Sequence, residues 1–145
     1  MIALIQRVTE ASVTVEGECI GRIGAGLLAL VAVEPGDDEK RLQRMAERLF
    51  GYRVFSDAAG RMNRSLADTG GGLLLISQFT LAADTDSGMR ASFTSAASPE
   101  HARLCFDRLL AVCRARDARV QTGRFGADMR VFLCNDGPVT FRLTA

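Results

Sequence analysis

A glycine–proline pair interrupts a strand-like segment near the C-terminal end of the 145-residue chain. Apolar residues dominate 131–134 and 139–143, and Gly137 and Pro138 lie between the two runs. Proline lacks the backbone N–H that a central strand needs, so the plainest interpretation is a tight turn joining two strands, 131–135 and 139–143. Because glycine has no side chain, the pair could instead let another molecule approach the backbone closely.

A second segment places polar residues at the end of a predicted strand. Three glycines at 70–72 precede the branched apolar residues 73–76, a pattern typical of a short buried strand. Ser77, Gln78 and Thr80 follow where this strand leaves the core. Strand ends that feed loops are common sites for binding groups, although Ser and Thr also often satisfy nearby backbone groups. The segment alone leaves both interpretations open.

The rest of the chain alternates predicted strands with two predicted helices. A helix is expected to begin after Pro35-Gly36-Asp37 and end at Gly51, and another to begin at Ser98-Pro99 with a buried stripe on one side. The other expected strands span 1–8, 12–15 (in a hairpin with a turn at 16–18), 26–33, 52–55 and 73–78. We therefore expect one domain, residues 1–145, of the α+β class, with a curled or barrel-like, mostly antiparallel sheet and two main helices on one side.

Composition excludes several classes of protein and supports no specific partner. Hydrophobic residues make up 48% of the chain and charged residues 24%, which is typical of a globular domain. There is no apolar span long enough for a membrane helix and no visible signal peptide, so a cytoplasmic location is expected. The net charge of +1 does not indicate nucleic-acid binding. The four cysteines form no CxxC pair, so free thiols are expected.

Conventional hydrolytic machinery is hard to assemble from this sequence. The single histidine, His101, falls in the first turn of a predicted helix, and no G-x-S-x-G motif is present. One histidine with scattered carboxylates gives no metal-ligand spacing, and Asp84 and Asp86 are expected to be solvated. Two possibilities remain: Thr80 or Ser77 acts as a nucleophile without a recognisable base, or catalysis uses no side chain at all.

Together, two strings of residues resemble one family closely. The chain has Ser-Gln-Phe-Thr-Leu at 77–81 and Asn-x-Gly-Pro-Val-Thr at 135–140, which are the signatures of bacterial-type D-aminoacyl-tRNA deacylases. The resemblance extends along the whole chain, including residues 1–8, Gly88-Met89-Arg90 and residues 122–125. Ala91 departs from it, because many members have proline after that Gly-Met-Arg triplet.

The resemblance implies an editing esterase that acts on tRNA. Its expected reaction is hydrolysis of the ester of D-aminoacyl-tRNA, and of glycyl-tRNA mischarged on tRNA-Ala, with rejection of L-aminoacyl-tRNA. Its expected form is a homodimer in which the Gly-Pro pair of one subunit, with a cis peptide bond, enters the pocket of the other. The expected partner is thus tRNA carrying a D-amino acid or glycine, with no DNA, no membrane, no metal and no cofactor.

The same resemblance assigns roles to individual residues. The backbone N–H groups of Phe79 and Thr80 would stabilise the oxyanion, and the 2′-hydroxyl of the RNA, or a water it orients, would move the proton. The Gly137 and Pro138 carbonyls would hold the substrate's α-ammonium group, and Arg7 would support their loop from behind. The substrate-binding set is Ser77, Gln78, Phe79, Thr80, Phe125, Met129, Gly137 and Pro138.

Two other functions stay open on the sequence alone. One is a hydrolase of small acyl substrates that uses Thr80 as its nucleophile, which would act on substrates lacking a ribose. The other is an RNA-binding module without catalysis, which would leave the Gly-Pro pair without a role.

Overall fold

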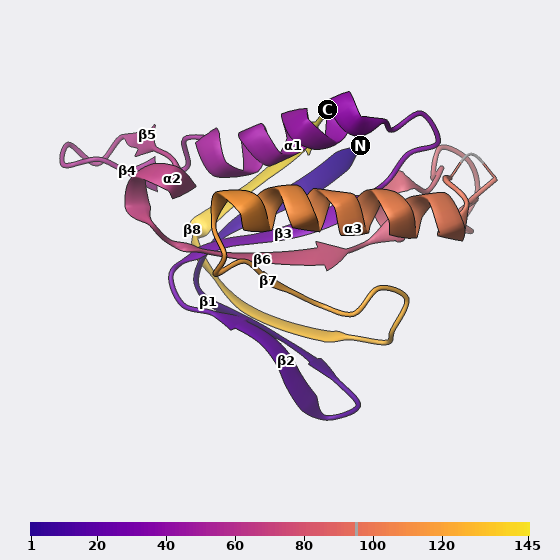
Figure 1. The fold of residues 1–145 in the computed structure, drawn as a ribbon, viewed down its shortest axis with the longest axis horizontal. Coiled ribbons are helices and arrows are strands. Elements are labelled where there is room, and N and C mark those ends of the chain that lie inside the picture. The colour runs from indigo at the N-terminus through magenta and orange to yellow at the C-terminus, as the bar shows by residue number, and fades with distance from the viewer. Residues whose placement is uncertain (95) are drawn as a thin grey trace.

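The computed structural model describes residues 1–94 and 96–145 as a curled sheet with two long helices packed over part of it (Figure 1). The expected α+β domain with a barrel-like sheet and two main helices is confirmed. In chain order the elements are β1 (Ile2–Val15), β2 (Glu18–Ile23), β3 (Gly26–Ala32), α1 (Glu39–Gly51), β4 (Phe55–Ser56), β5 (Met62–Arg64), α2 (Leu66–Thr69), β6 (Gly72–Ser77), the 3-10 turn η1 (Phe79–Ala82), α3 (Pro99–Arg116), β7 (Gln121–Thr122) and β8 (Arg130–Thr144).

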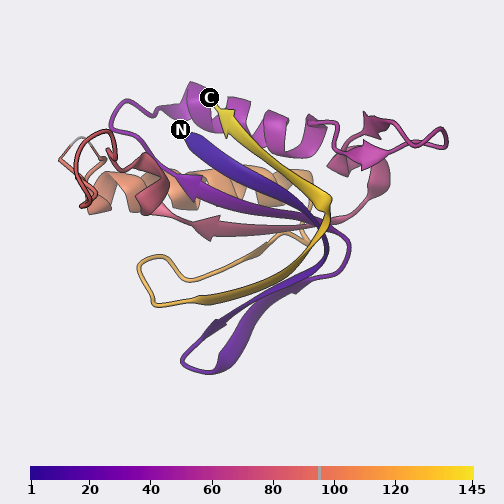
Figure 2. The same ribbon diagram turned by 180° about the vertical axis from the view of Figure 1, so that it is seen from behind.

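Strand β1 is the centre of the sheet. The strand order is β2-β1-β3-β6-β7, and β8 also pairs with β1. The first half of β1 pairs with β3 along one edge and with the end of β8 along the other, so that Ile2 lies opposite both Ala32 and Thr144. The second half pairs with β2 and with the start of β8, as Figure 2 shows from behind. The strands expected at 1–8 and 12–15 are thus one continuous strand.

The sheet mixes antiparallel and parallel pairs. Strand β1 runs antiparallel to β2, β3 and β8, whereas β3 with β6 and β6 with β7 run parallel. Strand β2 curls back until Gly21 lies close to β6 and β7: a Cβ built there would be 3.0 Å from the Thr122 carbonyl oxygen and 3.3 Å from Leu74. This approach almost closes the sheet into a barrel.

Two hydrophobic cores lie on opposite faces of β3 and β6. Leu27, Ala29, Leu73 and Leu75 face the helices, where they join the buried stripes of α1 and α3. Their neighbours in sequence point the other way, into the curled part of the sheet, and form a second core with β1 and β2: Val8, Ala11, Val13, Ile23, Leu28, Leu74 and Ile76. Because both faces are covered, these strands are almost continuously apolar, as the sequence indicated for residues 73–76.

Both helix starts follow their sequence signals. Asp38 caps α1 by accepting a hydrogen bond from the Arg41 N–H, and Ser98 caps α3, whose first residue is Pro99. The buried stripe predicted for this second helix is present on α3, where it consists of Ala102, Cys105, Phe106, Leu109 and Cys113, with Leu110 only partly buried beside them. None of the described helices is long and apolar enough to cross a membrane.

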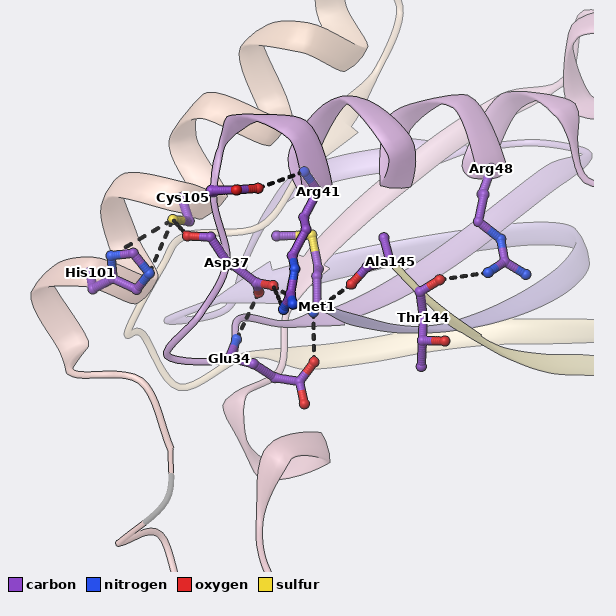
Figure 3. Close-up of polar contacts among 10 residues, drawn as sticks. Met1, Glu34, Asp37, Arg41, Arg48, His101, Cys105, Thr144 and Ala145 are labelled. Carbon is purple, nitrogen blue, oxygen red and sulfur yellow. Dashed lines mark hydrogen bonds and ion pairs between the residues drawn. The ribbon is translucent and has the colours of Figure 1, made fainter.

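The α-ammonium group of Met1 joins three parts of the fold (Figure 3). It lies 2.6 Å from carboxylate oxygens of both Glu34 and Asp37, and it donates to the Ala145 carbonyl oxygen at 3.2 Å. The Asp37 side chain is fully buried and also accepts from the Glu34 N–H at 2.8 Å. Breaking a buried ion pair from one side costs about 3–5 kcal/mol, because the remaining charge stays desolvated. The pair therefore holds β1, the turn before α1 and the end of β8 together.

Some expectations were wrong in detail. The segment expected as a strand at 52–55 forms only β4, which makes a small separate hairpin with β5. The two strands expected on either side of Gly137-Pro138 are one strand, β8. The chain does not reverse there, because β1 continues along both parts of β8 and keeps them in line.

The close contact between β3 and β6 gives a stability prediction. A Cβ built on Gly26 would lie 2.0 Å from the Gly72 carbonyl oxygen, so Gly26→Ala must push two paired strands apart. We expect the free energy of unfolding to fall by about 3 kcal/mol in chemical denaturation. Gly24→Ala is the matched control, because nothing lies within 4 Å of its Cβ. Equal stability of the two variants would contradict the observed packing.

Candidate functional site

A cavity of about 470 Å³ lies where β6 ends beside the start of α3. Residues 76–79 form one wall, and Pro99, Ala102 and Phe106 from α3 form another. Residues 125–129, in the loop before β8, close a third side. The lining is mainly apolar, with Ser77, Gln78 and Asp128 as its polar side chains. A concave, mostly apolar cavity with a few polar groups is typical of a small-molecule site.

The polar strand end expected at 77–80 forms the rim of this cavity. The Gln78 N–H still bonds the Val31 carbonyl oxygen at 2.7 Å, and the chain then turns into η1. Phe79 and Thr80 are the first two residues of that turn, and both are exposed. The first N–H groups of a helical turn have no partner inside it. Among the described residues, neither the Phe79 nor the Thr80 N–H donates to a protein acceptor.

Among the described residues, the Thr80 side chain has no hydrogen bond to a base. Its hydroxyl oxygen accepts a hydrogen bond from the Gln78 amide nitrogen, a donor that cannot remove a proton. His101 instead lies in the first turn of α3, with its two ring nitrogens 3.6 and 3.9 Å from the sulfur of Cys105, which is one turn further along the same helix (Figure 3). His101 is half-buried in this position. The arrangement gives Thr80 no partner that would activate it.

The thiols nearest this part of the fold are not activated either. Burial raises the pKa of the Cys113 thiol to about 12. Burial, followed by the negative charge of Asp37, raises the pKa of Cys105 as well. A thiol that stays protonated at neutral pH is a poor nucleophile. All four cysteines are free, and among the described residues no cluster of three or more His, Cys, Asp or Glu could hold a metal ion.

Gly137 and Pro138 lie in a bulge of β8. Gln6 of β1 pairs with Thr140 and Val8 pairs with Asn135, so the four residues 136–139 stand opposite Arg7 alone. The Gly137-Pro138 peptide bond is cis, and both residues are exposed. Neither residue lines the cavity of its own chain. Within one copy of the protein, the predicted site residues at the cavity are therefore separate from Gly137 and Pro138.

Side-chain hydrogen bonds hold the bulge in place. Arg7 Nε lies 3.2 Å from the Asp136 carbonyl oxygen and 3.1 Å from its carboxylate, while Arg7 Nη1 donates to the Val54 carbonyl oxygen at 2.6 Å. Asn135 accepts from the Val139 N–H and donates to the Thr140 hydroxyl, both at 3.0 Å. These bonds replace the backbone hydrogen bonds between β1 and β8 that the bulge interrupts.

The structure brings some of the predicted site residues together and leaves others apart. Ser77, Gln78, Phe79, Phe125 and Met129 do line one cavity, whereas Thr80 stands outside its lining. Sequence reasoning missed the α3 wall, because its residues have the ordinary apolar spacing of a helix that packs on a sheet. It also missed how Asn135 and Thr140 brace the bulge. The available signal was the position of these two polar side chains, two residues before and two residues after the Gly-Pro pair in a mostly apolar run.

The contacts of Arg7 give a prediction for the bulge. Lysine offers a single point charge and cannot reach Asp136 and Val54 together, so Arg7→Lys should loosen residues 136–139. We expect faster hydrogen exchange at the Val139 N–H and a loss of stability of about 1–3 kcal/mol. Arg142→Lys is the control, because Arg142 is exposed on β8, the strand that contains the bulge, and makes no ion pair among the described residues. Unchanged exchange in Arg7→Lys would show that Arg7 does not support the bulge.

Known proteins match this chain over almost its whole length. A protein named D-aminoacyl-tRNA deacylase from Xanthomonas campestris pv. campestris (strain 8004) is 66% identical over 144 residues, covering 99% of each chain. Proteins of the same name from Stenotrophomonas maltophilia (strain K279a) and Methylococcus capsulatus (strain Bath) are 67% and 66% identical, covering 99% of this chain and 99% and 94% of their own.

Solved structures share the fold. A chain titled c-Myc DNA Unwinding Element Binding Protein superposes with a TM-score of 0.95 at 38% identity, covering 100% of this chain and 99% of its own. A probable eukaryotic D-amino acid tRNA deacylase superposes with a TM-score of 0.80 at 16% identity, covering 98% of both chains. Residues 4–144 match the family described as D-Tyr-tRNA(Tyr) deacylase, and the chain therefore belongs to that family.

Proposed function

We propose that the protein hydrolyses the ester of D-aminoacyl-tRNA and so removes D-amino acids before they enter translation. Family membership supports this reaction, as do relatives of that name at 63–67% identity over nearly the full chain. The observation that carries the proposal is the cavity beside η1, whose rim presents two backbone N–H groups that have no acceptor among the described residues. We expect the enzyme to act in the cytoplasm, on tRNA that has just been charged.

In this proposal the reaction is catalysed by backbone groups and by the substrate itself. The ester carbonyl lies at the rim, where the Phe79 and Thr80 N–H groups stabilise the negative charge that develops on its oxygen. One such donor is typically worth about 2.7–4 kcal/mol. The vicinal 2′-hydroxyl of the terminal ribose, or a water it orients, moves the proton. This division of roles fits a rim where the Thr80 hydroxyl has only an amide partner.

The apolar cavity suits the end of the tRNA. Phe125 and Met129 supply apolar surface opposite Ser77 and Gln78, and Phe79 stands at the mouth with 62% of its surface exposed. An exposed aromatic ring at a cavity mouth can stack on a base, which is worth about 1–3 kcal/mol. The terminal adenosine would bind there, with its ester close to η1.

A second copy of the chain would complete the site. Strand β8 is 15 residues long and, among the described residues, pairs only with β1, so its other edge has no strand partner within that part of the chain. Phe132 and Leu133 on it are exposed by 57% and 38%. Long apolar edges are usually covered in native proteins. A homodimer across this strand would cover them, and it would carry Gly137 and Pro138 of one subunit to the cavity of the other.

Such a composite site would discriminate chirality by steric rejection. The exposed Gly137 and Pro138 carbonyls would hold the α-ammonium group and leave room only for hydrogen where an L side chain would lie. A D side chain would point outward, so its identity would matter little. Glycine has no side chain to reject, so glycyl-tRNA mischarged on tRNA-Ala should also be cleaved.

Matched substrates test this function directly. Wild-type protein incubated with D- and L-aminoacyl-tRNA of the same amino acid should release the D-amino acid and leave the L ester intact. Gly137→Ala should slow cleavage of the D ester, because φ at this position is +130° and the new Cβ would lie 2.7 Å from Val139 Cγ2. Cleavage of both esters at one rate, or of neither by folded wild-type protein, would refute the proposal.

The role of Thr80 separates the proposal from a side-chain nucleophile. If backbone and RNA groups perform the chemistry, Thr80→Ala should keep D-aminoacyl-tRNA cleavage within about tenfold of wild type. If Thr80 is the nucleophile, Thr80→Ala should instead lower the rate of cleavage several thousandfold. It should also abolish any acyl-enzyme that mass spectrometry detects in the wild-type protein. Gln78→Ala is a useful companion, because it removes the partner of the Thr80 hydroxyl and leaves that hydroxyl in place.

A further inference from the structure

Two exposed aromatic rings lie side by side at the mouth of the cavity. The rings of Phe79 and Phe93 have centroids 5.2 Å apart and are inclined by 49°. Their exposed fractions are 62% and 42%. The other two aromatic pairs of the described chain each include a ring packed against the main core. Leaving two adjacent aromatic rings in water forgoes the burial that normally stabilises such side chains, so this pair needs a separate explanation.

Backbone hydrogen bonds fix the chain on both sides of Phe93. After η1 the chain loops beyond the end of β6 before it enters α3 (Figure 1). Asp84 and Ser92 exchange two backbone hydrogen bonds of 2.9 Å, which closes the loop just before Phe93. On the other side, the Ala96 N–H donates to the Phe93 carbonyl oxygen at 3.0 Å. The Phe93 backbone is therefore held, and its ring is presented to solvent next to Phe79.

The two rings differ in their relation to the cavity. Phe79 lines it, whereas Phe93 does not, so Phe93 continues the aromatic surface outward from the mouth. If the terminal adenosine occupies the cavity, the RNA must leave through this mouth, and the preceding nucleotide must pass the outer ring. Stacked bases repeat every 3.4 Å. The wider spacing and inclination of these rings suit two successive bases that are splayed apart, each against its own ring.

We propose that Phe79 and Phe93 form a two-ring platform for the last two bases of the single-stranded RNA 3′ end. Phe79 contacts the terminal adenine, and Phe93 stacks on the base before it. This inference rests on the proposed function and extends the site by one nucleotide. Stacking on an aromatic face tolerates any base, so the platform adds affinity without reading sequence.

Binding of stable ligands tests the platform apart from catalysis. The probes carry a D-amino acid on the terminal adenosine through an amide, which the enzyme should not hydrolyse. One probe is the adenosine alone, one is the cytidylyl-adenosine dinucleotide, and one is the same dinucleotide without its cytosine base. The last probe separates the contribution of the base from that of the phosphate. Dissociation constants are measured by calorimetry on the full chain.

In wild-type protein the cytosine base should tighten binding by about five- to tenfold, at the lower end for base–aromatic stacking. The relevant ratio is the dissociation constant of the dinucleotide probe without its cytosine base divided by that of the complete dinucleotide probe. Phe93→Leu should bring this ratio to one, and Phe93→Tyr should keep the wild-type ratio because the ring remains. Leu104→Ala is the control, since Leu104 is an exposed apolar side chain on α3 outside the cavity lining, and it should leave the effect of the cytosine base unchanged.

The possible failures are distinguishable. A ratio of one in wild-type protein, or the same ratio in Phe93→Leu as in wild type, overturns the platform while the terminal-adenosine site stands. Failure of the adenosine probe to bind wild-type protein at all overturns the proposed function and the platform with it. Loss of the ratio in Phe93→Tyr as well would show that ring stacking is not its source.

Discussion

The pairing of one long strand with three others is the constraint on which the fold depends. Strand β1 carries β3 and β2 along one edge and β8 along the whole of the other. Its first half lies under the helices and its second half curls into the barrel, so it links the two hydrophobic cores. The buried ammonium of Met1 fixes the start of this strand against Asp37. A shift in the pairing of β1 by one residue would turn the side chains that now face one core toward the other face of the sheet, in all three pairings at once.

The same strand positions both parts of the candidate site. The cavity is built on β6, whose register is set through β3 by the first half of β1. The bulge at 136–139 exists because β1 supplies only Arg7 opposite four residues of β8. The proposed catalytic groups and the proposed chirality-selecting groups are thus both positioned by β1, even though the bulge does not line the cavity of its own copy. Geometric precision of this kind suits a site that must reject a mirror-image substrate sterically.

Local signals predicted the fold well, and signals that depend on distant partners did not. The helix caps at Asp38 and Ser98 act within one turn and could be found from sequence. The apolar run 73–76 likewise gave β6. The sequence around Gly137-Pro138 favours a turn, because a proline within a strand is exceptional and nothing local shows that β1 continues past it. Phe93 lies in a segment without periodicity, so only its contact with Phe79 in space draws attention to it.

The register of β1 with β8 also governs how the protein is made. Residue 2 pairs with residue 144, and Arg7 reaches across to Asp136, so the contacts that shape the bulge join the beginning of the sequence to its end. Contacts so distant along the chain slow folding, because a large loop must close before they form. Because β1 precedes β8 in the chain, the edge of β1 that pairs with β8 has no partner until β8 has been synthesised. The bulge that carries the proposed selectivity can therefore form only once β8 is present, and a product truncated before β8 would leave that edge of β1 exposed.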